Sequence, residues 1–152
     1  VADYPNLFVS RTFSKVYGMA GLRMGCLFSQ AANITWLHKA QSPYSVNALA
    51  VVCAAEAVQD RAYIDAYVAE ALESRRLLCR ALERLRLPYY PSAGNFVLAR
   101  FGDRSREIRD RLRDAGVLVR DRGHEIPGTL RITVGTKAQL RRFLAALREA
   151  LR

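Results

Sequence analysis

The sequence predicts an α/β protein built from two parts. Apolar side chains recur at helical spacing over several long segments, and short apolar runs bounded by turn-forming residues alternate with them. The chain has 152 residues, of which 51% are hydrophobic and 25% charged, which is enough apolar material to bury a core. A turn-forming stretch, Ser42–Ser45, is the predicted boundary. It separates a first part with two strands and a helix, residues 1–41, from a two-layer α+β part, residues 42–152.

The first part is predicted to place a loop between two buried strands. Leu7–Ser10 is a short apolar run that follows the turn-forming pair Pro5-Asn6. From Arg11 to Gly25 the chain has neither helical nor strand periodicity and contains three glycines, so we expect a loop. Cys26–Phe28 is the second apolar run, and a helix is predicted over Gln30–Gln41.

The second part is predicted to begin with two helices and then to alternate strands with helices. The first helix is predicted to be largely apolar and buried, and the later helices to carry apolar residues on one face at a spacing of about 3.6 residues. The predicted helices are Val46–Asp60, Ile64–Leu85 and Arg104–Ala115, and the predicted strands are Asn95–Phe101, Val117–Arg120 and Leu130–Val134. Thr136 and Gln139 have the spacing of a capping box, which predicts that a last helix begins there.

The charge balance is strongly basic, with 24 Lys and Arg against 14 Asp and Glu and a net charge of +10. Such an excess is typical of proteins that bind nucleic acid. Here basic residues alternate with acidic ones, as in Glu73–Arg76, and no five like charges follow one another. We therefore expect a solvated basic surface and no nucleic-acid partner. A non-catalytic basic module stays open as an alternative, and it would bind nucleic acid in a salt-sensitive manner.

The cysteines and the longest apolar run predict the setting of the protein. Cys26, Cys53 and Cys79 lie among apolar residues at spacings that suit neither a zinc site nor a disulfide framework. We therefore expect buried thiols, no metal and a cytoplasmic location. The apolar run Ala48–Ala55 is far shorter than the roughly 18 residues of a membrane helix, so we expect no membrane partner. The first residues lack the basic head and apolar stretch of a signal peptide.

The loop between the first two strands carries the most specific chemistry. Lys15 follows the hydroxyls of Thr12 and Ser14, and Arg23 comes eight residues later. Hydroxyls, backbone N–H groups exposed by glycine and a guanidinium fork together make a phosphate site. A lysine desolvated beside that site would have a lowered pKa and could attack an aldehyde as the neutral amine. Pyridoxal 5′-phosphate is an aldehyde that carries a phosphate, so the loop predicts this cofactor.

These residues resemble a known signature. Ser14-Lys15 followed by Gly21–Gly25 is similar to the cofactor-lysine motif of the fold-type I, class I/II pyridoxal-phosphate aminotransferases. The resemblance extends from Tyr4 to the end of the chain, and it is strongest to the histidinol-phosphate aminotransferases within that family. Four later segments carry this further resemblance: Pro43–Asn47, Ser92–Phe96, Gly116–Arg122 and Leu130–Thr136.

The resemblance implies that residues 1–41 are the end of the large cofactor domain. Lys15 would form the internal Schiff base with pyridoxal phosphate, while Thr12, Ser14 and Arg23 would hold the cofactor phosphate. Residues 42–152 would form the small α+β C-terminal domain. The chain would then be the C-terminal portion of the enzyme, inactive by itself because the partner of the cofactor ring nitrogen lies in the other portion.

The same resemblance implies a substrate site on the small domain. Arg131 would bind the substrate α-carboxylate through a two-bond fork, and an unpaired charge inside an apolar strand would otherwise be costly. Arg120 would contact the substrate side chain, and Asn95 would also lie at the site.

The activity implied is amino transfer between histidinol phosphate and 2-oxoglutarate in histidine biosynthesis. The expected partners are thus a small-molecule amino donor and a 2-oxo acid, and the full-length protein is expected to be a homodimer. Two alternatives within the same fold stay open, namely a threonine-phosphate-type decarboxylase and a broad aromatic aminotransferase.

Overall fold

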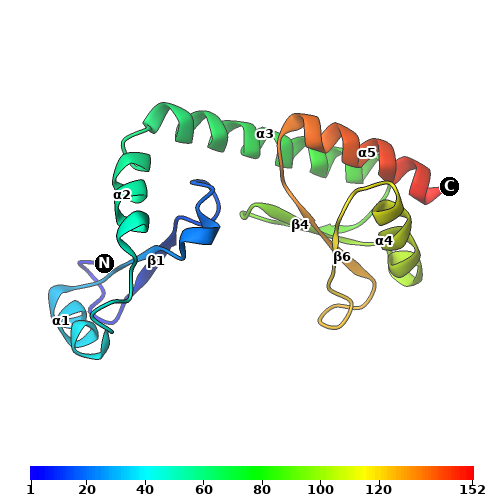
Figure 1. Ribbon diagram of the computed structural model, residues 1–152. Coiled ribbons are helices and arrows are strands. Elements are labelled where there is room, and N and C mark those ends of the chain that lie inside the picture. Colours follow the sequence, from blue (N-terminus) through cyan, green and yellow to red (C-terminus); the bar gives the residue numbers. More distant parts are fainter. The chain divides into compact units, whose positions relative to one another are not determined.

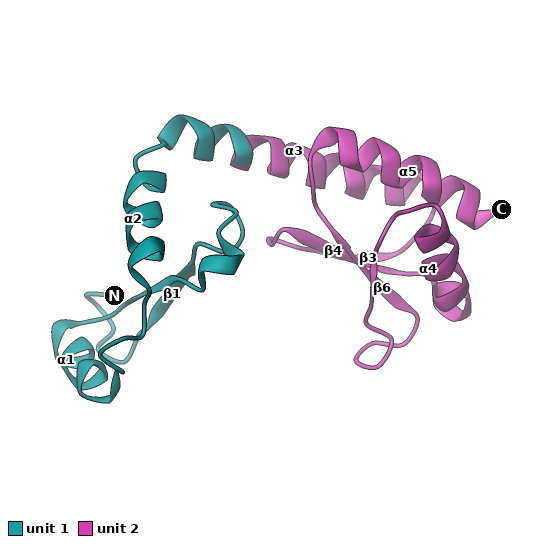
Figure 2. Ribbon diagram, in the orientation of Figure 1, with its two compact units in different colours: residues 1–67 teal, residues 68–152 magenta.

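The computed structural model describes residues 1–152 and has the mixed α/β composition predicted for the chain. It divides into two compact units, residues 1–67 and residues 68–152, and the division falls within one long helix (Figure 2). Each unit is described by itself below. The domain boundary that composition predicts at 42–45 lies inside unit 1 and stays a prediction.

Unit 1 contains a two-stranded antiparallel sheet and two helices (Figure 1). Strand β1 (Val9–Thr12) pairs with β2 (Gly25–Phe28), and the ladder ends where Thr12 lies opposite Gly25. A Cβ on Gly25 would lie 2.9 Å from the carbonyl oxygen of Arg11, so the close approach of the strands requires glycine there. Helices α1 (Ala31–Ala40) and α2 (Ala48–Ala57) follow.

The first predicted strand was placed two residues too early. Leu7–Ser10 was predicted from its apolar side chains, whereas pairing with β2 extends through Arg11 and Thr12. Side-chain character alone does not show over which residues two strands stay within hydrogen-bonding distance.

Unit 1 buries little apolar surface. Its buried apolar residues are Phe13, Ala50 and Ala54, while Trp36 is 69% exposed and Tyr44 is 92% exposed. The prediction that both strands and helix α2 are buried was therefore wrong, since most of their residues are exposed. The three cysteines are free, as expected, but each is half-buried rather than buried. In unit 1 this agrees with the small number of buried apolar residues.

Unit 2 contains a four-stranded antiparallel sheet in the order β3-β4-β6-β5 (Figure 1). The strands are β3 (Tyr89–Tyr90), β4 (Phe96–Arg100), β5 (Arg120–Asp121) and β6 (Thr129–Thr133). The helices are α3 (Arg61–Arg84), which begins in unit 1, α4 (Ser105–Asp114) and α5 (Lys137–Leu151). Short 3-10 turns lie at η1 (Ala20–Leu22) in unit 1 and at η2 (Gly102–Arg104) in unit 2.

The sheet of unit 2 has one buried face and one open face. Val97 of β4 lies opposite Ile132 of β6, Ala99 lies opposite Leu130, and all four side chains are buried. They form a core with Leu78 and Leu82 of α3, Ile108 and Leu112 of α4, and Leu140, Phe143 and Leu147 of α5. Alternate residues of the same strands therefore point to the other face, which no helix of unit 2 covers. That open face carries the predicted substrate residues.

The helix ends of unit 2 are specified locally. The predicted capping box is confirmed, because the Thr136 hydroxyl accepts a hydrogen bond from the Gln139 N–H and the Gln139 side chain accepts one from the Thr136 N–H. Gly116 follows the end of α4, and its φ of +71° suits glycine. Arg86 follows the end of α3 in the same way with φ of +55°, where a side chain is less favourable.

One strand prediction in unit 2 was wrong, and one strand was not predicted. The strand predicted over Val117–Arg120 is only Arg120–Asp121, because the N–H of Val117 donates to the Leu112 carbonyl and completes the end of α4. Strand β3 was not predicted, since Tyr89 and Tyr90 are only two residues with a proline on either side.

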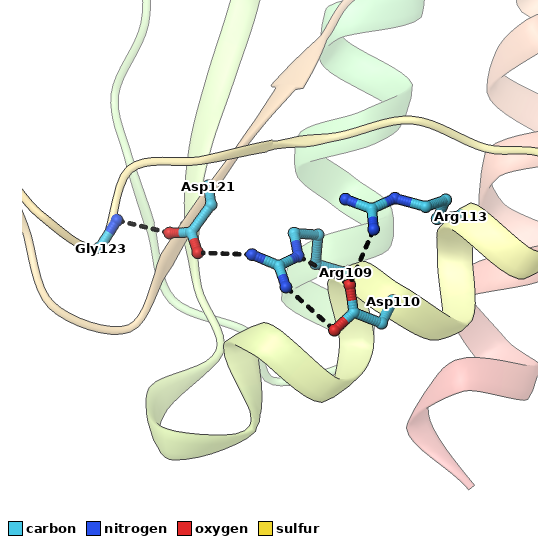
Figure 3. A network of polar contacts seen from close by, with 5 residues as sticks. All are labelled: Arg109, Asp110, Arg113, Asp121 and Gly123. Carbon is cyan, nitrogen blue, oxygen red and sulfur yellow. Dashed lines mark hydrogen bonds and ion pairs between the residues drawn. The ribbon is translucent and has the colours of Figure 1, made fainter.

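An ion-pair network ties α4 to the turn after β5 (Figure 3). Arg109 contacts Asp110 at 2.9 Å and Asp121 at 3.1 Å, and the other carboxylate oxygen of Asp121 accepts the Gly123 N–H at 2.7 Å. The hydrogen bonds from Arg109 hold the pKa of Asp110 below its ordinary value.

None of the helices in the structure is both long enough and apolar enough to pass through a bilayer.

Candidate active site

The predicted cofactor loop is anchored at its base by one buried aromatic residue. Phe13 is 8% exposed, and its ring lies 4.7 Å from that of Tyr17, measured between centroids. The Phe13 N–H donates to the Met24 carbonyl at 3.3 Å, and the Phe13 carbonyl accepts the Met19 N–H at 3.0 Å. The loop therefore closes on itself between β1 and β2.

The structure brings the three N-terminal candidate residues together at the start of this loop. The Thr12 hydroxyl accepts the Ser14 N–H at 3.0 Å, which fixes that hydroxyl beside the backbone. Lys15 begins a tight turn in which its carbonyl accepts the Gly18 N–H at 3.0 Å, and Gly18 has φ of +69°. The Lys15 side chain is exposed, so this chain does not itself supply the desolvation expected for a nucleophilic lysine.

Arg23 lies on the return of the loop in a left-handed backbone conformation with φ of +54°. For a residue with a Cβ this conformation costs roughly 1–2 kcal/mol and is retained only where the surroundings hold it. Its guanidinium donates to the Ala20 carbonyl at 2.9 Å and remains exposed. Thr12, Ser14, Lys15 and Arg23 thus lie on one closed loop, with hydroxyls, an amine and a guanidinium available to a phosphorylated aldehyde.

The predicted substrate residues lie in unit 2, on the open face of its sheet. Arg131 of β6 pairs with Leu98 on one side and lies directly opposite Arg120 of β5 on the other. Directly opposed residues have Cβ atoms about 4.5–5.5 Å apart, and two like charges in this arrangement repel. The Arg131 guanidinium also lies over the ring of Phe96, 5.2 Å from its centroid.

Arg131 has no protein partner for its charge. Its Nε is buried and makes no hydrogen bond, and no carboxylate lies within ion-pairing distance of its guanidinium. A buried polar atom without a partner is uncommon and costs about 1–3 kcal/mol. The arrangement can accept an anion, because a bound carboxylate or phosphate would pair with Arg131 and screen it from Arg120.

Asn95 lies at the start of β4. Its backbone carbonyl accepts the Val134 N–H at 2.8 Å, and its side chain is exposed and makes no hydrogen bond. The structure therefore gives Asn95 a strand-end role and leaves its amide free. Sequence reasoning missed Phe96 as the neighbour of Arg131, although Phe96 lies next to Asn95 in the segment Ser92–Phe96 that carries the family resemblance. The strand alternation that puts residues 96 and 98 on one face was the available signal.

Comparison with solved structures defines the class of protein to which this fold belongs. Histidinol-phosphate aminotransferase from Sinorhizobium meliloti, in complex with pyridoxal-5′-phosphate, superposes with a TM-score of 0.85 at 31% identity, over 99% of this chain and 42% of that chain. L-threonine-O-3-phosphate decarboxylase from Porphyromonas gingivalis superposes with a TM-score of 0.78 at 26% identity, over 99% of this chain and 49% of that chain. The class is thus that of the fold-type I pyridoxal-phosphate enzymes.

The sequence comparison gives the family. The model of the aminotransferase class I and II family matches residues 1–147, and the chain belongs to that family. Histidinol-phosphate aminotransferase from Symbiobacterium thermophilum is 44% identical over 152 residues, covering 99% of this chain and 42% of that protein. The chain thus spans about two-fifths of the length of the curated relatives it matches.

Proposed function

We propose that this chain is the C-terminal portion of a pyridoxal-phosphate-dependent aminotransferase that transfers an amino group between histidinol phosphate and 2-oxoglutarate. Residues 1–41 would belong to the large cofactor domain and residues 42–152 to the small domain. The family assignment supports amino transfer, and the relatives named as histidinol-phosphate aminotransferases support the substrate.

The observation that carries the proposal for the substrate is the unpaired guanidinium of Arg131 opposite Arg120. Two arginines on one open face suit a substrate that brings concentrated negative charge. Histidinol phosphate carries a phosphate and 2-oxoglutarate carries two carboxylates, so one face could serve both in turn. Arg131 would take the α-carboxylate of the oxo acid, and Arg120 would lie toward the other end of the substrate.

The loop residues fit the proposed cofactor by the chemistry of their donors. Thr12, Ser14 and Arg23 would hold the phosphate of pyridoxal phosphate through hydroxyl and guanidinium groups, and Lys15 would hold its aldehyde carbon through the ε-amine. The bound cofactor supplies an electron sink for the substrate carbon. Lys15, released by the incoming amine, would take the proton from the substrate Cα and return it as general base and acid.

We also propose that the full-length protein is a homodimer and works in the cytoplasm. The exposed apolar side chains of unit 1, among them Leu49 and Val52 on α2, support association with further protein. The three free cysteines are compatible with a reducing compartment.

The experiment that tests the cofactor site is borohydride reduction of the full-length protein followed by peptide mapping. The chain has only three lysines, at 15, 39 and 137, so the labelled position is easily distinguished. Reduced label on Lys15 blocks tryptic cleavage there, so it should appear on the peptide 12–23. Label on Lys39 or Lys137, or a label that survives Lys15→Ala, would refute the assignment.

The decarboxylase alternative keeps a specific support, since the threonine-phosphate decarboxylase from Porphyromonas gingivalis shares the fold at 26% identity. Product analysis separates the two reactions. Amino transfer converts 2-oxoglutarate to glutamate without release of carbon dioxide, whereas decarboxylation releases carbon dioxide and needs no oxo acid. A non-catalytic basic module would bind nucleic acid in a salt-sensitive manner and take up no cofactor.

A further inference from the structure

Asn47 links two segments that the sequence separates by 25 residues. Its amide nitrogen Nδ2 donates to the Leu22 carbonyl at 3.2 Å, in the cofactor loop. Its amide oxygen Oδ1 accepts the Ala50 N–H at 2.8 Å, in the first turn of α2. One side chain therefore caps a helix and contacts the loop at the same time.

The loop contact acts on a specific peptide plane. The Leu22 carbonyl and the Arg23 N–H belong to one planar peptide unit, and rotation of that unit about the Arg23 N–Cα bond is the φ of Arg23. The N–H edge faces the Ala20 carbonyl at 3.5 Å, and the carbonyl edge accepts the hydrogen bond from Asn47. The plane is thus held at both edges.

This plane needs to be held because Arg23 has φ of +54°, a conformation that residues with a Cβ seldom adopt. The hydrogen bond at the N–H edge is long, at 3.5 Å, so the one from Asn47 is the shorter of the two. The helix cap anchors Asn47 in turn, because an N-cap side chain that accepts an N–H is fixed in orientation. Loss of Asn47 would leave the Arg23 backbone free to relax.

We propose that Asn47 is a positioning residue, which uses the N-terminus of α2 to keep Arg23 in the conformation that presents its guanidinium to the cofactor phosphate. The inference rests on the proposed function, since it needs the phosphate site of the loop. It assigns no contact between Asn47 and the cofactor. Its effect passes entirely through the Leu22–Arg23 peptide.

The test separates the two hydrogen bonds of Asn47. Asn47→Ser keeps a hydroxyl that can cap α2 but is too short to reach the Leu22 carbonyl. Asn47→Ala removes both interactions. Thr136→Ala removes the cap of α5 in unit 2 and serves as the control for a lost helix cap away from the loop.

The first measurement is hydrogen–deuterium exchange of the full-length apoenzyme, which needs no cofactor. In Asn47→Ser we expect the amides of peptide 20–28 to exchange about three- to tenfold faster, the effect of one net hydrogen bond, while peptides of α2 stay unchanged. If Asn47→Ser changed the exchange rate of the loop, relative to the wild type, no more than that of α2, Asn47 would be a helix cap only and the inference would be overturned.

The second measurement is the dissociation rate of pyridoxal phosphate from the full-length holoenzyme, followed by the loss of its absorbance. We expect Asn47→Ser and Asn47→Ala to release the cofactor about three- to tenfold faster than the wild type and Thr136→Ala to release it at the wild-type rate. Wild-type retention by Asn47→Ser would overturn the inference and leave the proposed function intact. A wild-type protein that binds no pyridoxal phosphate would overturn both.

Discussion

Replacement of Arg131 by alanine tests whether the open face of the sheet is a substrate site. In the full-length enzyme the variant should slow both half-reactions, with glutamate and with histidinol phosphate, because both ligands would use the same guanidinium. Loss of a desolvated, charge-assisted contact costs about 2–5 kcal/mol. This corresponds to a rate loss of about 30- to 4,000-fold in kcat/KM.

The structure predicts that the same substitution does not lower stability. Arg131 has no ion-pair partner, so its removal leaves no carboxylate unpaired. The variant loses the contact with the Phe96 ring, worth about 0.5–1 kcal/mol. It also removes the repulsion from Arg120, a gain of about 0.2–1 kcal/mol. The buried Nε without a partner is removed as well, a gain of about 1–3 kcal/mol. We therefore expect the free energy of unfolding of unit 2 to rise by up to about 3 kcal/mol, the sum of these gains less the lost ring contact.

Single-turnover kinetics of each half-reaction and hydrogen–deuterium exchange of β6 peptides measure the two effects separately. Arg131→Lys keeps the charge without the fork and should recover only part of the rate. Arg106→Ala, an exposed arginine of α4 without an ion pair, controls for the loss of one positive charge. Arg120→Ala should alter the preference between phosphorylated and aromatic amines more than the rate with glutamate. If Arg131→Ala lowered stability by several kcal/mol, or left both half-reactions unchanged, the substrate role would be refuted.

Three further predictions concern unit 2, and hydrogen–deuterium exchange of the full-length protein measures each of them. Ser74→Ala should stabilise the unit by about 1 kcal/mol, because the buried Ser74 hydroxyl has no partner. Thr129→Val should destabilise it by about the same amount, because the buried Thr129 hydroxyl donates to a backbone carbonyl at 2.7 Å, and a stability change of the same sign in both variants would contradict this. Because the pKa of Asp110 is lowered, its contribution to the free energy of unfolding is present above the ordinary carboxyl pKa of about 4 and is lost as the pH falls through the lower folded-state pKa. Asp110→Asn should therefore flatten the acid side of the profile of stability against pH, and an unchanged profile would count against this. Arg86→Gly should stabilise the end of α3 by up to about 1 kcal/mol by removing the strain of its positive φ, while Gly116→Ala should destabilise α4 by about 1 kcal/mol, and a loss in both would show that φ is not the cause.

The helices and their ends could be predicted because their determinants are local. All five helices overlap segments that were predicted to be helical, and the Thr136–Gln139 capping box needs only residues three apart. The strands were predicted less well because pairing depends on distant residues. Val117 has the side chain of a strand residue, yet its N–H is used by the end of α4, so no apolar pattern could reveal that it stays outside the sheet.

The two groups of candidate residues differ in the same respect. Thr12, Ser14, Lys15 and Arg23 lie within twelve residues of one another, and their motif was recognisable from the sequence alone. The register that sets Arg120 opposite Arg131 and the hydrogen bond from Asn47 to the loop depend on tertiary structure. Residue type could not distinguish these arginines from the many others in the chain.

Arg131 differs from several other arginines of unit 2 in the contacts that its guanidinium group makes. Arg104 of η2 and Arg111 of α4 donate to the last carbonyls of α5, and Arg109 pairs with two carboxylates, so these guanidinium groups complete helix ends and ion pairs. Arg131 has no such partner and faces a second arginine, an arrangement that lowers stability unless an anion is bound. A basic surface that served only solubility would not need a guanidinium whose Nε is shielded from water. The unpaired charge on the open face is therefore better explained by a ligand that is bound during turnover than by the arginine-rich composition of the chain.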